Sequence, residues 1–420
     1  MAWKDSPPIS VSTLKHADDH SRGPATPDHR IVRALWPVLL AAVISLFPFT
    51  IFSTFLVPIA ESANQETSVV GVLRGLGGVA ALLTGIALAP LIARWSAPYT
   101  TAASLAMLAG TSLIATIGTL PALIVFCVSI GAATAVLTPT LLQIATTAYT
   151  RRGDSGRAAT LVTATQSLAA VLAAPVIGGI ALWNGWQGAL WVTAGAAAVL
   201  AVCFLLTSRA PRPGRTAGPR YADAFGQLRR RTDLLALIGI AFLRTTAFMG
   251  YLAILAAHYD DRFALEPASF VLVWSLSGAS FFIGNFLAGR WARGGRRRQK
   301  LLLGLGLVGA GVALGTVFTT DLLPLALTAT AVLGFAHAVV AALITTLIAE
   351  RGDHLTAPAF SINAAGMSLG VFTGALLGGA GLALGGGAAL AWTLGIPTLL
   401  AIALVPAATR EAAAAEQASG

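Results

Sequence analysis

The segment LLALIGIAFLRTTAFMGYLAILAAH, from Leu234 to His258, is apolar almost throughout but carries Arg244 near its middle. A helix rises about 1.5 Å per residue, so a run of this length crosses the roughly 30 Å of hydrocarbon in a bilayer. A bare arginine at that depth costs roughly 3 kcal/mol or more. The segment therefore predicts a membrane-spanning helix on which Arg244 faces protein or a water-filled cavity.

The whole chain has the composition of such helices. Hydrophobic residues make up 56% of the 420 positions and charged residues 10%, whereas soluble domains carry about a quarter charged residues. The apolar runs are too long and too continuous for the alternating strands of a membrane β-barrel. Both cysteines, Cys127 and Cys203, lie inside these runs, so we expect neither a disulfide framework nor a metal site. We predict an all-α integral membrane protein with no cofactor.

The apolar runs form two sets of six. A segment rich in Pro, Gly and Arg separates the sets and is predicted to be a cytoplasmic linker, residues 208–231. It divides a six-helix bundle at 31–207 from a second bundle at 232–409, and residues 1–30 and 410–420 are predicted to be cytoplasmic tails, the first of them disordered. The predicted spans lie near 34–59, 68–92, 100–118, 121–148, 157–182, 187–207, 233–258, 267–289, 300–318, 322–349, 356–383 and 388–408.

The basic residues predict the orientation of these spans. With the amino terminus inside, 24 of the 27 Lys and Arg residues fall in inner segments, and Arg262 alone falls in an outer loop. This bias places both termini on the cytoplasmic side of the cell membrane. The net charge of +10 then reflects topology and contact with anionic lipid, because no soluble basic face for nucleic acid is present.

The two sets of spans repeat short motifs at nearly constant offsets. The Leu-Ile-Ala-Arg-Trp of residues 91–95 matches Leu-Ala-Gly-Arg-Trp at 287–291, and Arg-Gly-Asp occurs at both 152–154 and 351–353. A row of small residues in the fifth span matches a row of glycines in the eleventh, each about 200 positions later. These motifs indicate a duplicated six-helix unit. The matching rows are Ala170, Ala174, Gly178 and Gly179, then Gly370, Gly374, Gly378 and Gly379.

Past residue 30 the chain resembles the major facilitator superfamily. The stretches GIALAPLIARWSAP and GNFLAGRWARGGRRRQK are similar to the loops that follow the second and eighth helices in that family. Arg94 and Arg290 fit the pattern, while Ala93 and Gly289 replace its acid. The resemblance implies two six-helix bundles with a substrate site between them at mid-depth, exposed to one side at a time. It also implies that Arg94 and Arg290 belong to a cytoplasmic gate.

The fifth span is similar to that of the drug–proton antiporters of this family. AVLAAPVIGG, residues 170–179, keeps Pro175, Gly178 and Gly179 of the antiporter signature, while Ala170 and Ala174 replace two of its glycines. Cys127 stands where the antiporters' fourth helix has an arginine. With Gly370 and Gly374 in the eleventh span, these small residues predict a contact between the halves that opens and closes; general helix packing is the alternative.

The polar residues within the spans are the candidate site. No acidic residue lies at mid-membrane, so Arg244 has three possible roles: structural bonding to carbonyls and hydroxyls such as Thr245, binding an anionic group of the substrate, or tuning a titratable group. Arg74 either reaches outward towards Glu61 or Glu66 or serves as a second anion ligand. His337 is either a core histidine or the proton-coupling residue.

Three further side chains complete this set. Asn363 and Gln166 lie on the eleventh and fifth spans and either bind substrate or bridge helices. Phe52 belongs to an aromatic cluster of the first span that either packs or lines an apolar pocket.

Two functions follow, both with a small-molecule substrate, and the protein is expected to be a monomer in the membrane. The first is proton-coupled export of a drug or metabolite by alternating access, for which a hydrophobic cation is disfavoured because no buried acid would pair with it. The second is transport or exchange of an anion through Arg244. A membrane enzyme or sensor is the remote alternative, since no span carries a catalytic cluster and both tails are short.

Overall fold

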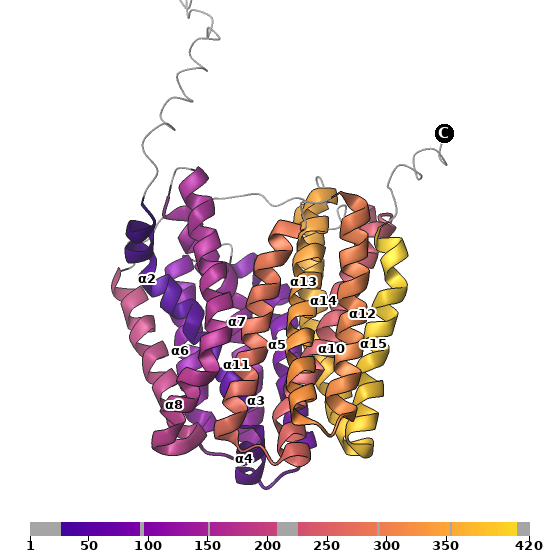
Figure 1. Ribbon diagram of the computed structural model, residues 1–420. Helices are drawn as coiled ribbons and strands as arrows, with labels where there is room; N and C mark the ends of the chain where they lie inside the picture. The colour runs from indigo at the N-terminus through magenta and orange to yellow at the C-terminus, as the bar shows by residue number, and fades with distance from the viewer. Residues whose placement is uncertain are drawn as a thin grey trace, which may run out of the picture.

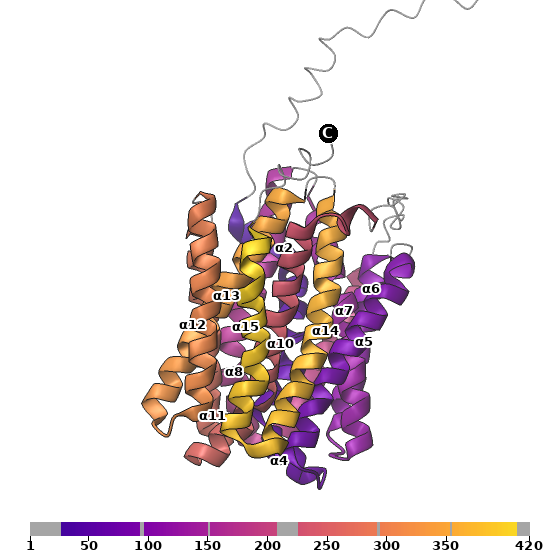
Figure 2. The ribbon, with the colours of Figure 1, turned by 90° about the vertical axis from the view of Figure 1, so that its right-hand side faces the viewer.

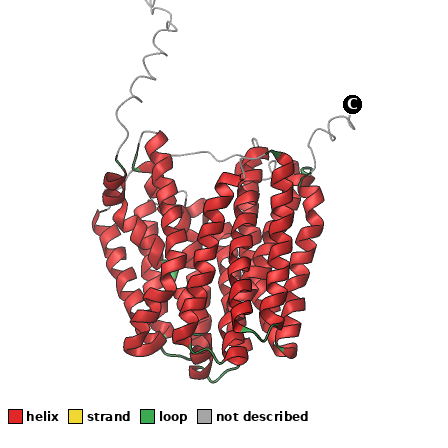
Figure 3. Ribbon diagram, in the orientation of Figure 1, coloured by secondary structure: helices red, strands yellow, loops and turns green. Residues whose placement is uncertain are grey.

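The computed structural model describes residues 27–92, 96–149, 152–207, 226–291, 295–352 and 355–409. Helices dominate these ranges, and no strand occurs within them (Figure 3). The first half contains α2 (Asp28–Ile44), α3 (Phe47–Thr54), α4 (Leu56–Ser62), α5 (Thr67–Ile92), α6 (Ala97–Ala115), α7 (Leu120–Thr147) and α8 (Arg152–Thr207). The second contains α10 (Thr232–Phe263), α11 (Pro267–Trp291), α12 (Arg296–Thr319), α13 (Leu323–Arg351), α14 (Thr356–Gly385) and α15 (Gly387–Ala408).

These helices make the twelve predicted passes. In the described ranges, 10 helices are long and apolar enough to cross a membrane. The long helix α8 contains two passes, and the shorter α6 makes the remaining one. Residues 1–26 of the tail predicted at 1–30, the tail at 410–420 and residues 208–225 of the predicted linker lie outside the described residues. The helix α2 begins at Asp28, within the predicted first tail.

The first pass differs from the single span predicted at 34–59. It consists of α2, α3 and α4, with breaks around Ser45 and Phe55. Pro48 lies in the first turn of α3, where its missing N–H is tolerated. Pro58 has no N–H to donate to the carbonyl of Thr54, the last residue of α3. Two prolines therefore divide this pass into shorter segments.

The fifth and sixth passes form one continuous run, α8, with a kink. Asn184 (φ −153°, ψ 41°) and Gly185 (φ 57°, ψ −152°) leave the helical conformation there. Glycine tolerates the positive φ because it has no Cβ. The kink lies between the predicted spans at 157–182 and 187–207, so the position of the turn agrees with the sequence.

The passes are arranged as two halves side by side. In Figure 1 the helices α2, α6, α7 and α8 lie to the left and α12 to α15 to the right. The start of α2 and the end of α15 lie at the same face, which we call the terminal face; α4 lies at the opposite face. Two helix pairs, α5 with α14 and α8 with α11, pack the halves against each other, and the first pair is visible in Figure 2.

Two arginines tie the helix ends of the second half together at the terminal face. Arg231 forms a bidentate pair with Asp233 and donates from Nη2 to the carbonyl of Arg351, 2.9 Å away. Arg351 in turn donates from Nη1 to the carbonyl of Ala408 at 2.6 Å. Each arginine thus satisfies a carbonyl at the end of a neighbouring helix, which the helix itself leaves without a donor.

We expect Arg351→Met to lower the free energy of unfolding by about 1–3 kcal/mol, because the Ala408 carbonyl loses a charged donor. Thermal unfolding of the purified protein in detergent measures the effect. Arg298→Met, at an exposed position of α12, is the control. Equal melting temperatures for the two variants would mean that the Arg351 bond does not stabilise the fold.

Candidate substrate and proton site

Arg244 lies near the middle of α10 and is 7% exposed. Its Nη1 atom lies 2.5 Å from Nε2 and 3.3 Å from Nδ1 of His337, on α13. Its Nη2 atom reaches the hydroxyl of Thr245 only at 3.5 Å. The structure thus brings together the two residues that the sequence singled out for substrate binding and for proton coupling.

The chemistry of this contact defines the state of the histidine ring. All the N–H groups of arginine are donors and the guanidinium has no acceptor, so the nitrogen of His337 that it contacts must accept. A neutral imidazole has one such acceptor nitrogen, whereas an imidazolium has none. The contact between Arg244 and His337 therefore exists only while the ring is neutral.

Aromatic rings surround this pair. Phe248, one turn after Arg244 on α10, stacks on His337 with ring centroids 3.7 Å apart and 15° between the planes. Phe281 on α11 lies 5.9 Å from the same ring and 6.4 Å from Phe248. Three helices thus contribute aromatic rings around the contact between Arg244 and His337.

Arg74 points into the first half and not outward. It is 8% exposed, and its Nη1 atom donates to the hydroxyl of Ser53 at 2.7 Å. Its guanidinium carbon lies 5.9 Å from the centroid of the Phe49 ring. Both partners belong to α3, so the interpretation that Arg74 reaches Glu61 or Glu66 is wrong.

The surroundings of Arg74 include the fourth pass. Gly77, one turn further along α5, is so close to α7 that a Cβ there would lie 3.0 Å from the carbonyl oxygen of Cys127. Cys127 and Arg74 are near neighbours. The fourth-helix position that carries an arginine in the antiporters is a cysteine here, and α5 supplies a guanidinium to the same region.

Asn363 and Gln166 lie apart from these contacts. Asn363 is 9% exposed on α14, and its Nδ2 atom lies 3.6 Å from the sulfur of Met367. Its Oδ1 atom is buried without a donor among the described residues. Gln166 is half-buried on α8. Their proposed roles in substrate binding remain predictions.

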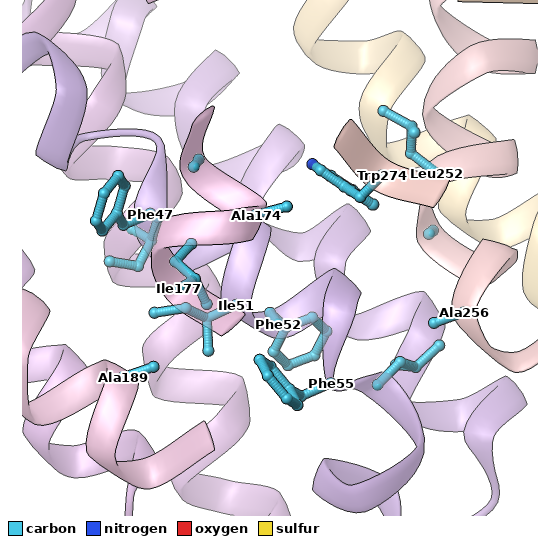
Figure 4. Close-up of a cluster of buried hydrophobic side chains, with 14 of the residues drawn as sticks. Phe47, Ile51, Phe52, Phe55, Ala174, Ile177, Ala189, Leu252, Ala256 and Trp274 are labelled. Carbon is cyan, nitrogen blue, oxygen red and sulfur yellow. The ribbon is translucent and has the colours of Figure 1, made fainter. Parts of the chain in front are cut away.

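Phe52 belongs to an apolar cluster between the halves (Figure 4). It is 2% exposed and stacks on Phe126 of α7, with ring centroids 6.0 Å apart. Figure 4 places its ring beside that of Phe55, with Ala256 of α10 nearby, and places Trp274 of α11 between Ala174 and Leu252. Phe52 thus packs between the halves in this conformation.

The small-residue rows make two kinds of contact. Gly178 on α8 lies against Val271 of α11, in the other half, whereas a Cβ at Gly179 would meet open space. Gly370 and Gly374 on α14 lie against the backbone of α10, in their own half. The contact between halves therefore involves Gly178 but not the Gly370–Gly374 pair. In the second row it involves Gly379, where a Cβ would lie 3.0 Å from the carbonyl oxygen of Ser68 on α5. In the same part of α8, Ala174 is buried and Pro175 is exposed.

The contacts of three further residues that were predicted to act in gating are not described by the structure. Arg94 lies outside the described residues, and so do the side chains of Ala170 and Arg290.

Sequence reasoning missed the α5 side of the contact between halves. Gly71, Gly75 and Gly78 are spaced four and three residues apart, which places them on one helix face. Cβ atoms at Gly75 and Gly78 would meet Phe372 and its neighbours on α14, and one at Gly71 would lie 3.4 Å from Ile254 of α10. This spacing was the available signal. Ser53, Phe248 and Phe281 carried no comparable signal.

Comparison with known proteins identifies relatives of this architecture. The family model described as Major Facilitator Superfamily matches residues 38–358. No protein of curated function matches the chain in sequence.

Solved structures of transporters have the same fold. A bacterial homologue of the human lysosomal transporter Spinster, in an inward-facing and occupied conformation, superposes with a TM-score of 0.69 at 15% identity, covering 92% of this chain and 96% of that one. A mutant of the nucleoside transporter NupG gives a TM-score of 0.67 at 16% identity, covering 88% and 98%. At such identities the similarity concerns the fold alone.

Proposed function

Because the chain belongs to the major facilitator superfamily, we propose that it is a proton-coupled secondary transporter that exports a small molecule across the cytoplasmic membrane. The basic residues favour placing the terminal face in the cytoplasm. The two halves would rock against each other and expose the substrate alternately to the two sides of the membrane.

The contact between Arg244 and His337 is the observation that carries the proton coupling. A proton arriving at His337 removes the acceptor that Arg244 uses and places a second positive charge beside the guanidinium. Coulomb repulsion at this distance, in a poorly hydrated site, then drives the two side chains apart. Because they lie on α10 and α13, protonation would change how these two helices pack.

The apolar cluster around Phe52 supports alternating access. Phe52 and Phe55 belong to the first half, while Leu252 and Trp274 belong to the second. The cluster lies nearer the opposite face than Arg244 does, since Leu252 follows Arg244 along α10 towards that face. With the terminal face in the cytoplasm, this cluster would be the outer gate in its closed state.

We expect His337→Gln to abolish transport driven by a pH gradient while retaining substrate exchange. Glutamine can accept the bond from Arg244 but does not titrate. Purified protein in liposomes, with a fluorescent pH probe inside and a panel of neutral, cationic and anionic compounds, measures the first activity. Counterflow of a labelled substrate without a gradient measures the second. Proton-driven accumulation by the variant at the wild-type rate would contradict the proposal.

Anion transport is the second candidate, and a different observation favours it. The Nε atom of Arg244 is buried and has no acceptor among the described residues. Arg244 forms none of the salt bridges seen in these ranges. A buried donor without a partner costs about 1–3 kcal/mol, more when it is charged, and an anionic substrate would remove that cost.

A further inference from the structure

The guanidinium of Arg244 is bonded on one side, and its other edge is buried without a close acceptor among the described residues. His337 takes the Nη1 atom. Nε has no acceptor among the described residues, and Nη2 has only the distant hydroxyl of Thr245 at 3.5 Å. The N–H groups of Nε and Nη2 point the same way in the guanidinium plane. This edge is the fork that binds the two oxygens of a carboxylate in parallel.

The single positive charge of the Arg244 guanidinium would be neutralised by a ligand with one negative charge. Within the described ranges no carboxylate pairs with Arg244, and the two side chains that it contacts through hydrogen bonds, Thr245 and neutral His337, carry no charge. A monoanion leaves the buried site neutral. A dianion would bring a second charge that nothing here compensates, which is costly at such depth.

The aromatic rings near Arg244 favour a particular shape for the rest of the ligand. Phe248 and Phe281 lie with 24° between their planes, and Phe248 and His337 with 15°. Phe281 and His337 lie with 36° between their planes. Aromatic rings from three helices favour a flat partner, because offset stacking adds to the burial of apolar area. Branched bodies gain apolar burial but not this stacking, and strongly polar bodies lose hydration against these rings.

We propose that Arg244 binds the carboxylate of a flat aromatic monocarboxylate through Nε and Nη2, with Phe248 and Phe281 against its ring. This inference rests on the proposed transport function and names the substrate class of the same site. The carboxylate and the His337 ring would therefore contact adjoining edges of one guanidinium.

The test is direct binding to the purified full-length protein in detergent, measured by calorimetry. The probes are 2-naphthoate, its uncharged isostere 2-naphthamide and naphthalene-2,6-dicarboxylate. We expect the wild type to bind the acid at least about 30-fold more tightly than the amide or the dianion. Arg244→Gln should remove this preference for the acid, and Arg244→Lys, which keeps the charge without the fork, should reduce it. Arg33→Gln, at an exposed position of α2, should leave it unchanged.

Several results would overturn the inference: no binding of naphthoate, equal binding of acid and amide, or a preference that survives in Arg244→Gln. The elution profile and the melting temperature of each variant establish that it is folded before its binding is measured. A failure of the carboxylate-site proposal can be distinguished from a failure of the transport proposal. Proton flux with neutral compounds but no naphthoate binding refutes only the carboxylate site. Naphthoate binding together with gradient-driven transport in His337→Gln refutes only the proton coupling.

Discussion

Gly78→Leu is expected to reduce transport by about 5- to 150-fold, because it places a side chain where the two halves touch. A Cβ at Gly78 would overlap the carbonyl oxygen of Ser368 on α14 and lie 2.9 Å from the backbone nitrogen of Phe372. Both obstacles are backbone atoms of the other half, so no rotamer relieves the overlap. Overpacking of this kind costs about 1–3 kcal/mol, which shifts a two-state equilibrium by the stated factor.

The same helix provides a matched control. Gly85 lies two turns further along α5, and a Cβ there would meet nothing within 4 Å. The Gly85→Leu substitution raises helix propensity as much as Gly78→Leu does, but it creates no overlap with another helix. Wild-type transport in this variant, together with the loss in Gly78→Leu, assigns the defect to the contact between halves.

The conformational change can be measured separately from transport. In a background of Cys127→Ala and Cys203→Ala, the pair Gly71→Cys and Ile254→Cys joins α5 to α10, since a Cβ at residue 71 lies 3.4 Å from the Ile254 side chain. We expect Gly78→Leu to lower the yield of this cross-link, because the state with the halves in contact becomes less populated. An unchanged yield and unchanged transport would mean that α5 and α14 slide without hindrance.

The number of passes and the place of most turns follow from the sequence, because a bilayer requires long apolar helices and penalises every unpaired backbone group. The kink at Asn184 and Gly185 falls between two predicted spans for this reason. The broken first pass was missed because apolar composition remains continuous across 34–59. Pro48 and Pro58 interrupt its hydrogen bonds without interrupting its hydrophobicity.

The sequence identified residues of the candidate site but did not show which of them contact each other. Depth and charge identified Arg244 and His337, since a mid-membrane cation and a lone histidine are costly. The two residues are 93 positions apart, and no periodicity within either helix relates them. For Arg74, the rule that arginines near a helix end reach the membrane surface predicted the wrong direction. Ser53 and the face of Phe49 provide partners inside the bundle instead.

Arg74→Met is expected to raise the melting temperature and to lower transport at least about tenfold. Arg74 is 8% exposed, and no carboxylate pairs with it within the described ranges. One bond to the Ser53 hydroxyl and one aromatic face do not replace the hydration that a buried guanidinium loses. Methionine fills a similar volume without that cost, and removing buried charges in favour of apolar groups stabilises by about 1–4 kcal/mol in comparable cases.

A fold that gains stability when a residue is replaced does not need that residue for packing. Intramembrane cations are kept for function, so the stabilised Arg74→Met protein should be inactive. Arg262→Met, which removes a half-exposed arginine paired with Asp321, should change neither quantity appreciably. If Arg74→Met instead lowers the melting temperature, the arginine holds α3 in place through Ser53 and Phe49. In that case Arg74 stabilises the broken first pass, and Arg244 is left as the proposed substrate-binding charge.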